Sequence, residues 1–275
     1  MKTNEKAIGQ MSKILEIFKA SEGEIRPHCI ITGPSGSGKT FTLTQLCENM
    51  EINLIEVNAA QLTKEGMSGN SLSKALAAGI TMQWAPFVVL VDEFDKLFLS
   101  GNNHETAHEV TTGVQNEFLK VLESDTTQIY GDYGKYVTMA VNKCLFIFMG
   151  AFNGMPDLDV DKLREIGVKT EFLGRAGLVY NMQKVSLEEM LKLVDDSILL
   201  KKYRELFPKE DHNKAVRLIK AEVRSAYENN TLGARLINSL VHQYYINGGL
   251  TKKVAATTSF SRKLSFAQGA AFDKN

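Results

Sequence analysis

One short segment, residues 33–40, constrains the fold more than any other feature of this 275-residue chain. It follows an apolar, strand-like run at residues 28–32 and precedes a helical pattern, as a phosphate-binding P-loop requires. Its glycines let backbone N–H groups turn toward phosphates, and the following helix N-terminus favours negative charge. We therefore predict nucleotide binding, with Lys39 at the β- and γ-phosphates and Thr40 on a magnesium ion. The predicted nucleotide-binding residues of this loop are Gly33, Pro34, Ser35, Gly36, Ser37, Gly38, Lys39 and Thr40.

A second motif lies downstream. Residues 87–91 form a continuous apolar run that ends in Asp92 and Glu93, the pattern of a buried central strand that delivers two carboxylates. We predict that Asp92 holds the magnesium and that Glu93 orients and polarises the attacking water, because phosphoryl transfer depends on positioning its nucleophile. Asp95 is assigned only to local geometry. An acidic cluster after a strand is often a solvated loop, but the P-loop upstream favours the catalytic interpretation.

Short apolar runs alternate with helical patterns up to about residue 182, which predicts an α/β fold. We expect a parallel five-stranded sheet with flanking helices, in a large nucleotide-binding domain over residues 1–183. From Ser186 the pattern changes, because Ser186 and Glu189 form a capping-box pattern and helical periodicity then continues to about Ile246. This predicts a small helical domain over 184–250 and a flexible tail over 251–275. The predicted strands are 28–32, 53–58, 87–91, 144–149 and 177–182.

The composition excludes several classes of protein. Hydrophobic residues make up 44% and charged residues 23% of the chain, with five prolines, which is typical of a globular protein. Basic and acidic residues number 32 each, so overall attraction to nucleic acid or to a membrane is not indicated. Cys29, Cys47 and Cys144 form no CxxC pair, which argues against disulfides and cysteine-rich zinc sites. The longest apolar runs are too short for a membrane span, and residues 1–6 lack a signal-peptide pattern, so we expect a cytoplasmic protein.

With these motifs in place, the chain resembles the AAA+ ATPases, most closely the ClpX branch of the Clp family, whose members unfold proteins for a bacterial protease. The resemblance covers nearly all of residues 7–248 and includes both motifs described above. The further matching segments are Ala7-Ile8-Gly9-Gln10 (adenine contact), residues 62–69 (first pore loop), Gly150-Ala151-Phe152 (end of the sensor-1 strand), Glu171-Phe172-Leu173-Gly174-Arg175 (arginine finger) and Gly233-Ala234-Arg235 (sensor 2).

The resemblance implies ATP and Mg²⁺ as ligands and a homo-oligomeric ring, a hexamer in this family, that acts on a protein substrate. Carried over, Ile8 contacts the adenine, Arg175 reaches the γ-phosphate held by a neighbouring subunit, and Arg235 touches the nucleotide of its own subunit. Phosphoryl transfer supports such roles, because negative charge develops on oxygens that a guanidinium can meet bidentately. A single arginine is more often a surface or ion-pair residue, so the flanking matches carry this assignment.

Two departures from the family pattern concern partners. Nothing before Ala7 resembles a cysteine-ligated zinc domain, so a recruiting module of that kind is expected to be missing. Residues 153–170 are too few to include the family's protease-docking loop, and Ile166-Gly167-Val168 directly precedes the finger segment and does not replace that loop. We therefore expect no docking to a ClpP-type protease.

A third departure concerns residues 66–69 of the first pore loop, which have Met67 where the family places an aromatic residue that grips the threaded chain. Methionine can still contact an extended polypeptide, though with less rigid contact area than tyrosine. We assign Met67 to the substrate pore, while threading itself stays open. Tyr130, Tyr133 and Tyr136 are interleaved with glycines and fit either a second pore-facing loop or a plain surface hairpin.

Residues 104–108 spell the HExxH pattern of zinc proteases, which on a helix would place His104 and His108 one turn apart. Against a metal site, polar residues 101–103 place the string at a loop or helix start, and no downstream histidine completes a longer zinc motif. By resemblance the string lies near the family's second pore loop, which is the interpretation we prefer.

Three functions remain in view. The leading hypothesis is a ring-forming ATPase that unfolds or remodels proteins without an attached ClpP-type protease. The second is a nucleic-acid-associated AAA+ factor of the helicase or clamp-loader type, which would carry a basic stripe or an added DNA-binding motif, and neither is clear in the sequence. The third is a nucleotide-gated scaffold, against which Glu93 and Arg175 argue because a pure switch needs neither.

Overall fold

The structure is a computed structural model that describes residues 2–65, 69–99, 105–131 and 134–250, with only the backbone described for residues 2, 99 and 105–110. Contacts divide the chain into two compact units. The first is Met1–Met190 together with Asn229–Arg235, and the second is Leu191–Glu228 together with Leu236–Asn275. The predicted domains 1–183 and 184–250 stay a prediction, and the predicted tail 251–275 lies outside the described residues.

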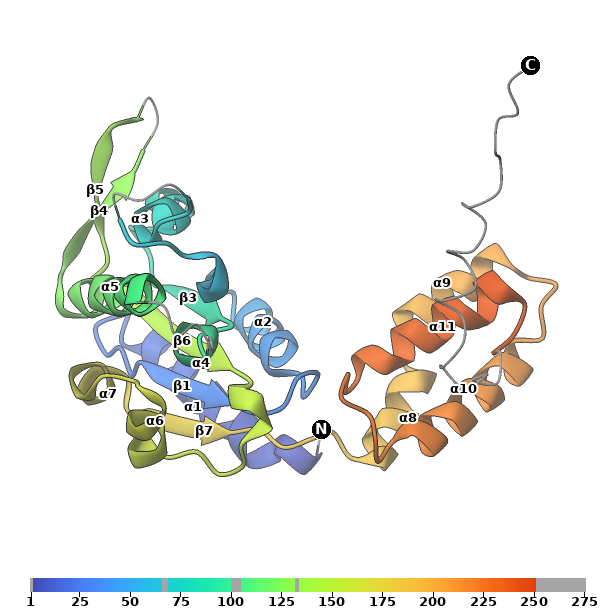
Figure 1. Cartoon of the computed structure of the whole chain (residues 1–275). Helices are drawn as coiled ribbons and strands as arrows, with labels where there is room; N and C mark the ends of the chain where they lie inside the picture. The colour runs from blue at the N-terminus through green and yellow to red at the C-terminus, as the bar shows by residue number, and fades with distance from the viewer. Residues whose placement is uncertain (1, 66–68, 100–104, 132–133, 251–275) are drawn as a thin grey trace, which may run out of the picture. The chain divides into compact units, whose positions relative to one another are not determined.

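The first unit is built on a five-stranded sheet in which every neighbouring pair of strands is parallel (Figure 1). The strand order is β2-β3-β6-β1-β7. The α/β class and the five-stranded parallel sheet are therefore confirmed, and β3 continues one residue further than predicted, to Asp92. The strands of this sheet are β1 (Cys29–Thr32), β2 (Asn53–Asn58), β3 (Phe87–Asp92), β6 (Cys144–Gly150) and β7 (Leu178–Asn181).

Helices flank this sheet, as the alternating pattern predicts (Figure 1). Short 3-10 turns complete several of the connections. The helices of this part of the chain are α1 (Glu5–Ala20), α2 (Lys39–Asn49), α3 (Leu72–Ala75), α4 (Lys96–Leu99), α5 (Glu105–Glu123), α6 (Val160–Ile166) and α7 (Thr170–Ala176), with 3-10 turns η1 (Lys2–Asn4), η2 (Ala59–Gln61), η3 (Leu76–Thr81) and η5 (Phe152–Gly154).

Both faces of the sheet are buried, because alternate residues of each strand enter different hydrophobic clusters. On β6, Phe146 and Phe148 pack in one cluster with residues of α5, α6 and α7. Leu145, Ile147 and Met149 of the same strand pack in the other cluster, with residues of α1 and α2. Every residue of β6 is buried, so this strand leaves room for polar side chains only beyond its ends.

A second, two-stranded sheet lies outside the predicted strands. β4 (Thr126–Tyr130) and β5 (Tyr136–Ala140) pair antiparallel, with Tyr130 opposite Tyr136. Only Ile129 and Met139 are buried in it, so the apolar periodicity that predicts a strand is weak here. The tyrosine segment therefore forms a hairpin, but its orientation toward a pore stays a prediction, and Tyr133 lies outside the described residues.

The chain after Ser186 is helical, as its periodicity predicts. The capping box is formed: the Ser186 hydroxyl accepts the N–H of Glu189, and a Glu189 carboxylate oxygen accepts the N–H of Ser186, both at 3.3 Å. Ser197 and Asp211 cap the next two helices, each accepting a backbone N–H three residues on. No helix in the described ranges is long and apolar enough to cross a membrane. The helices here are α8 (Leu187–Asp195), α9 (Ile198–Leu206), α10 (His212–Ala226) and α11 (Arg235–Asn247).

The three cysteines are unpaired and buried in the first unit. Cys29 and Cys47 lie in the cluster beside α1 and α2, and Cys144 lies in the cluster on the other face of the sheet. Burial raises the pKa of the Cys29 and Cys47 thiols to about 12, and it raises the pKa of Cys144 well above its usual value. Because the thiolate is the reactive form of cysteine, these thiols are chemically inert at neutral pH.

His28 is a structural histidine that immediately precedes β1. It is 7% exposed, and its Nδ1 accepts a hydrogen bond from the backbone N–H of Phe146 at 3.0 Å. Burial, followed by the charge of Arg26, lowers the pKa of His28 to about 4. The neutral ring is therefore the form that the folded protein holds, and it helps to join β1 to β6.

We predict that acid destabilises the protein through His28. The unfolded chain protonates this ring below about pH 6.5, whereas the folded state resists protonation until about pH 4. The contribution of neutral His28 to the free energy of unfolding is therefore fully present above pH 6.5. It falls as the pH drops from 6.5 to 4, and the loss is roughly 2 kcal/mol at pH 5. In His28→Gln, whose amide oxygen can still accept the Phe146 hydrogen bond, this part of the loss should vanish. Urea unfolding at pH 7 and pH 5 measures the difference.

The matched control is His242→Gln, at an exposed histidine, which should keep the wild-type loss. An equal loss of unfolding free energy in His28→Gln and in the wild type would contradict the prediction.

Candidate functional site

The P-loop connects the end of β1 to α2, whose first residue is Lys39. Two of its glycines approach other backbone so closely that no side chain fits. Gly33 has a φ of 144°, and a Cβ there would lie 2.4 Å from the carbonyl oxygen of Met182. Gly36 has a φ of 70°, and a Cβ there would lie 2.2 Å from the carbonyl oxygen of Leu232. The loop conformation therefore requires glycine at both positions.

The N-terminus of α2 is suited to an anion. Its N-cap is Gly38, at a φ of 91°, which supplies no side-chain hydrogen bond, and its first turn carries no acidic residue. The first N–H groups of a helix lack intrahelical partners, and the helix dipole adds positive potential at this end. Phosphate groups fit such a position, as the sequence motif predicts.

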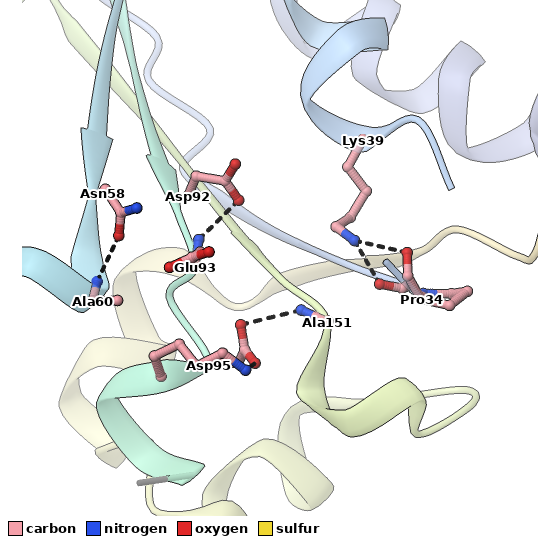
Figure 2. Close-up of polar contacts among 10 residues, drawn as sticks. Pro34, Lys39, Asn58, Ala60, Asp92, Glu93, Asp95 and Ala151 are labelled. Carbon is pink, nitrogen blue, oxygen red and sulfur yellow. Dashed lines mark hydrogen bonds and ion pairs between the residues drawn. The ribbon is translucent and has the colours of Figure 1, made fainter. Parts of the chain in front are cut away.

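Lys39 is held inside the loop. It is 8% exposed, and its ammonium donates to the carbonyl oxygens of Gly33 at 2.5 Å and Pro34 at 3.1 Å (Figure 2). Burial lowers the pKa of Lys39, while the carboxylates of Asp92 and Asp95 act in the opposite direction. These acceptors and charges compensate for the desolvation of a cation that would otherwise be unfavourable in the interior.

Thr40 and Asp92 meet where α2 begins and β3 ends. The Thr40 hydroxyl donates to Oδ2 of Asp92 at 3.1 Å, and Oδ1 of Asp92 accepts the backbone N–H of Glu93 at 2.8 Å. A hydroxyl and a carboxylate are hard oxygen ligands of the kind that Mg²⁺ takes together with phosphate oxygens. The donor set therefore fits the predicted magnesium ion.

Glu93 follows β3 in an unusual backbone conformation. Its φ of 54° lies in the left-handed region, which residues other than glycine rarely adopt and which recurs at functional sites. The two successive carboxylates take different surroundings, because Asp92 is bonded to Thr40 while the Glu93 side chain is exposed. An exposed carboxylate next to a magnesium ligand can accept a proton from water.

Asp95 joins the ends of β3 and β6. It is 1% exposed, and its Oδ1 accepts the backbone N–H of Ala151 at 3.1 Å (Figure 2). Its Oδ2 pairs with the ammonium of Lys96 at 3.1 Å. Gly150 leaves room for this arrangement, because a Cβ there would lie 2.9 Å from Asp95 Oδ1. The local role predicted for Asp95 thus extends to a contact with the segment matched to sensor 1.

These side chains surround one cavity of about 340 Å³. Arg235 belongs to it: the segment before α11 packs on the P-loop, and Arg235 Nη1 donates to the Ser35 hydroxyl at 3.4 Å. Phe41 also lines the cavity and is 68% exposed, a residue that the sequence reasoning missed. Its position directly after Thr40 is the signal that could have found it. The predicted residues brought together here are Ser35, Gly36, Gly38, Lys39, Thr40, Asp92, Glu93 and Arg235.

Other predicted residues lie elsewhere. Ile8, on α1, is partly buried against the cluster beside α1 and α2 and is not among the residues that line the cavity. Arg175, on α7, is not among them either and forms an ion pair with Glu123. Met67 and His104 lie outside the described residues. The roles assigned to Ile8, Arg175 and Met67 stay predictions, as do the roles assigned to the residues that line the cavity and the placement of His104 near a pore loop.

Comparison with known proteins identifies relatives. Proteins named ATP-dependent Clp protease ATP-binding subunit ClpX are similar to this chain. The ClpX of Treponema denticola is 25% identical over 189 residues, which cover 64% of this chain and 44% of the relative. The ClpX of Borrelia duttonii is 24% identical over 240 residues, 70% of this chain and 56% of the relative, and that of Azotobacter vinelandii is 24% identical over 228 residues, 66% and 52%. The chain thus spans about half the length of these curated relatives.

A family-level match agrees with the motifs. Residues 29–172, just over half of the chain, match the ATPase family associated with various cellular activities (AAA). The match begins at β1 and ends within α7, so it includes the P-loop, Asp92 and Glu93. The resemblance inferred from the motifs is therefore confirmed at the level of the family. This chain belongs to the AAA family and is an ATPase.

Proposed function

We propose that this ATPase works as one subunit of a ring, a hexamer, that unfolds or remodels other proteins. The observation that carries the proposal is the single cavity on which Lys39, Thr40, Asp92, Glu93 and Arg235 converge. The cavity has residues to bind the phosphates, to hold the magnesium ion and to activate the attacking water. A nucleotide-gated scaffold would not need the last of these, the residue that activates water. The similarity to ClpX proteins supports the use of this motor on polypeptides.

ATP and Mg²⁺ fit the residues that face this cavity. Thr40 and Asp92 would hold the ion, which when bound neutralises charge on the β- and γ-phosphate oxygens. Lys39 and the N–H groups of the loop bind the phosphates, because both present positive charge there. Glu93 orients a water molecule against the terminal phosphate and accepts its proton. Arg235 also lines the cavity, so its guanidinium can contact the same phosphates.

Arg175 supports assembly into a ring. It does not line the cavity of its own subunit, and its side chain is 38% exposed, so a neighbour can reach part of it. An arginine supplied in trans neutralises charge that develops in the transition state. A closed ring gives every site one such arginine from the adjacent subunit.

The segment between η5 and α7 supports the proposal that no ClpP-type protease docks here. Residues 153–170 form part of η5, α6, short connections and the first residue of α7. Val168 is 1% exposed, Ile166 packs against the same core, and Gly167 is the C-cap of α6 at a φ of 112°. These three residues are therefore used within the fold and do not present an exposed docking loop.

We predict that Glu93→Gln and Arg175→Ala both lower steady-state ATP hydrolysis strongly. Loss of the base should cost about 10²- to 10⁴-fold in kcat, and loss of an arginine finger about 10³- to 10⁵-fold. Glu93→Gln should still bind ATP, because Lys39, Thr40 and Asp92 are intact, and should form a ring that ATP stabilises. Phosphate release and native mass with and without ATP measure these effects.

The matched control for Arg175→Ala is Arg164→Ala, because Arg164 is also an exposed arginine paired with a carboxylate, that of Asp161. The control should keep wild-type activity. A wild type that stays monomeric with every nucleotide would contradict the ring, and an Arg175→Ala variant as active as the wild type would contradict the finger.

We also predict that the Glu93→Gln ring retains unfolded polypeptide. A variant that binds ATP without hydrolysing it should hold a substrate that the wild type releases. Fluorescein-labelled casein serves as the unfolded probe, and its anisotropy with ATP and with ADP gives the measurement. If casein anisotropy is the same with ATP and with ADP and duplex DNA stimulates the ATPase activity, the nucleic-acid alternative would be favoured instead.

A further inference from the structure

Aromatic packing in the core fixes α7, the helix that carries Arg175. Phe172, on α7, is fully buried and stacks on Phe94 with ring centroids 5.2 Å apart. It also meets the edge of Phe148, on β6, at 4.8 Å. Phe94 follows Glu93 in the chain, so α7 rests directly on the turn that carries the proposed base. The backbone at Arg175 therefore has a defined place relative to the catalytic turn.

Hydrogen bonds to side chains of α5 also hold the start of α7. At the start of α7, the backbone N–H of Lys169 donates to the side chain of Gln115 at 3.3 Å. The Lys169 ammonium donates to the side-chain oxygen of Asn116 at 2.5 Å. Gln115 is 4% exposed, so this contact belongs to the core and not to the surface. These bonds fix one end of α7 against α5.

Arg175 makes the corresponding contact at the other end. Its Nη1 donates to the carbonyl oxygen of Glu171, one turn earlier, at 2.9 Å. Its Nη2 forms an ion pair with Oε1 of Glu123, the last residue of α5. Both terminal nitrogens of the guanidinium thus have acceptors within the subunit, while the side chain as a whole remains 38% exposed.

Stability alone does not explain this ion pair. The Glu123 side chain is 47% exposed, and pairs with this exposure contribute little to folding. A carboxylate at the C-terminal end of a helix is also disfavoured by the helix dipole. The pair does, however, restrict a long side chain that otherwise samples many rotamers, and that restriction lowers the entropy lost when the guanidinium meets a phosphate.

We propose that Glu123 is the positioning residue of the arginine finger: it holds the Arg175 guanidinium in the orientation in which a neighbouring subunit's γ-phosphate meets it. The inference rests on the proposed function, since Arg175 is the finger only in that proposal. Glu123 itself touches neither nucleotide nor water in the reaction. It acts through Arg175 alone, and its effect therefore requires that arginine.

The test compares Glu123→Ala, Glu123→Gln, Arg175→Ala and the Glu123→Ala/Arg175→Ala double variant. Glu123→Ala should lower kcat for ATP about 10- to 100-fold, as misplaced catalytic groups do, with little change in KM, ring mass or melting temperature. Glu123→Gln keeps an acceptor oxygen for Nη2 and should recover most of the rate. In the Arg175→Ala background, single-turnover hydrolysis should be no slower when Glu123 is also replaced.

The matched control is Asp161→Ala, which removes the carboxylate partner of another exposed arginine and should leave kcat unchanged. An equal rate loss from Glu123→Ala in both backgrounds, an equal loss in the control, or an unchanged or raised kcat in Glu123→Ala would overturn the positioning role. If Arg175→Ala abolishes hydrolysis but Glu123→Ala does not slow it, only this inference fails. If Arg175→Ala hydrolyses ATP normally, the finger fails and Glu123 has nothing to position.

Discussion

Apolar side chains close both faces of the five-stranded sheet, and the location of the charged site follows from that closure. β6 is buried along its whole length and β1 likewise, so neither strand can carry a charge on its sides. On these two central strands polar groups can enter only at the ends, and parallel strands bring their carboxyl ends to one edge. The P-loop after β1 and the carboxylates after β3 meet there for that reason, and Arg235 reaches the same edge from a distant part of the chain.

Charge compensation is the second organising effect. Lys39 is a buried cation with two acidic residues acting on it, and Asp95 is a buried anion bonded to Ala151 and paired with Lys96. Each charge is tolerable in the interior because the others are present. The site is therefore a set of mutually dependent groups, and removing one carboxylate alters the surroundings of the lysine as well as the metal ligands.

Sequence pattern predicted those features whose residues lie close together in the chain. The P-loop, the Asp92-Glu93 pair and the five strands of the sheet are contained in short stretches whose spacing and polarity identify them. Apolar periodicity did not predict the strands β4 and β5, because Ile129 and Met139 are the only buried residues of these two strands. The glycines interleaved with the tyrosines did favour a surface hairpin as one of two interpretations. The Asp95 contact with Ala151 and the Glu123 contact with Arg175 each join residues more than fifty positions apart, and no periodicity encodes such pairings. The role of Ile8 rests on resemblance alone, since that residue packs against the cluster beside α1 and α2 and is not among the residues that line the cavity.

The buried thiols have a practical consequence for fluorescent labelling of this protein in solution. Maleimides and similar reagents attack thiolate, and Cys29, Cys47 and Cys144 supply almost none at neutral pH. A single cysteine introduced at an exposed site such as Val137, on β5, can therefore carry a fluorophore without removal of the native cysteines. Trp84 is the sole tryptophan and is 82% exposed. The chain thus offers a single tryptophan as energy donor and a background of unreactive thiols, which suits site-specific energy-transfer measurements.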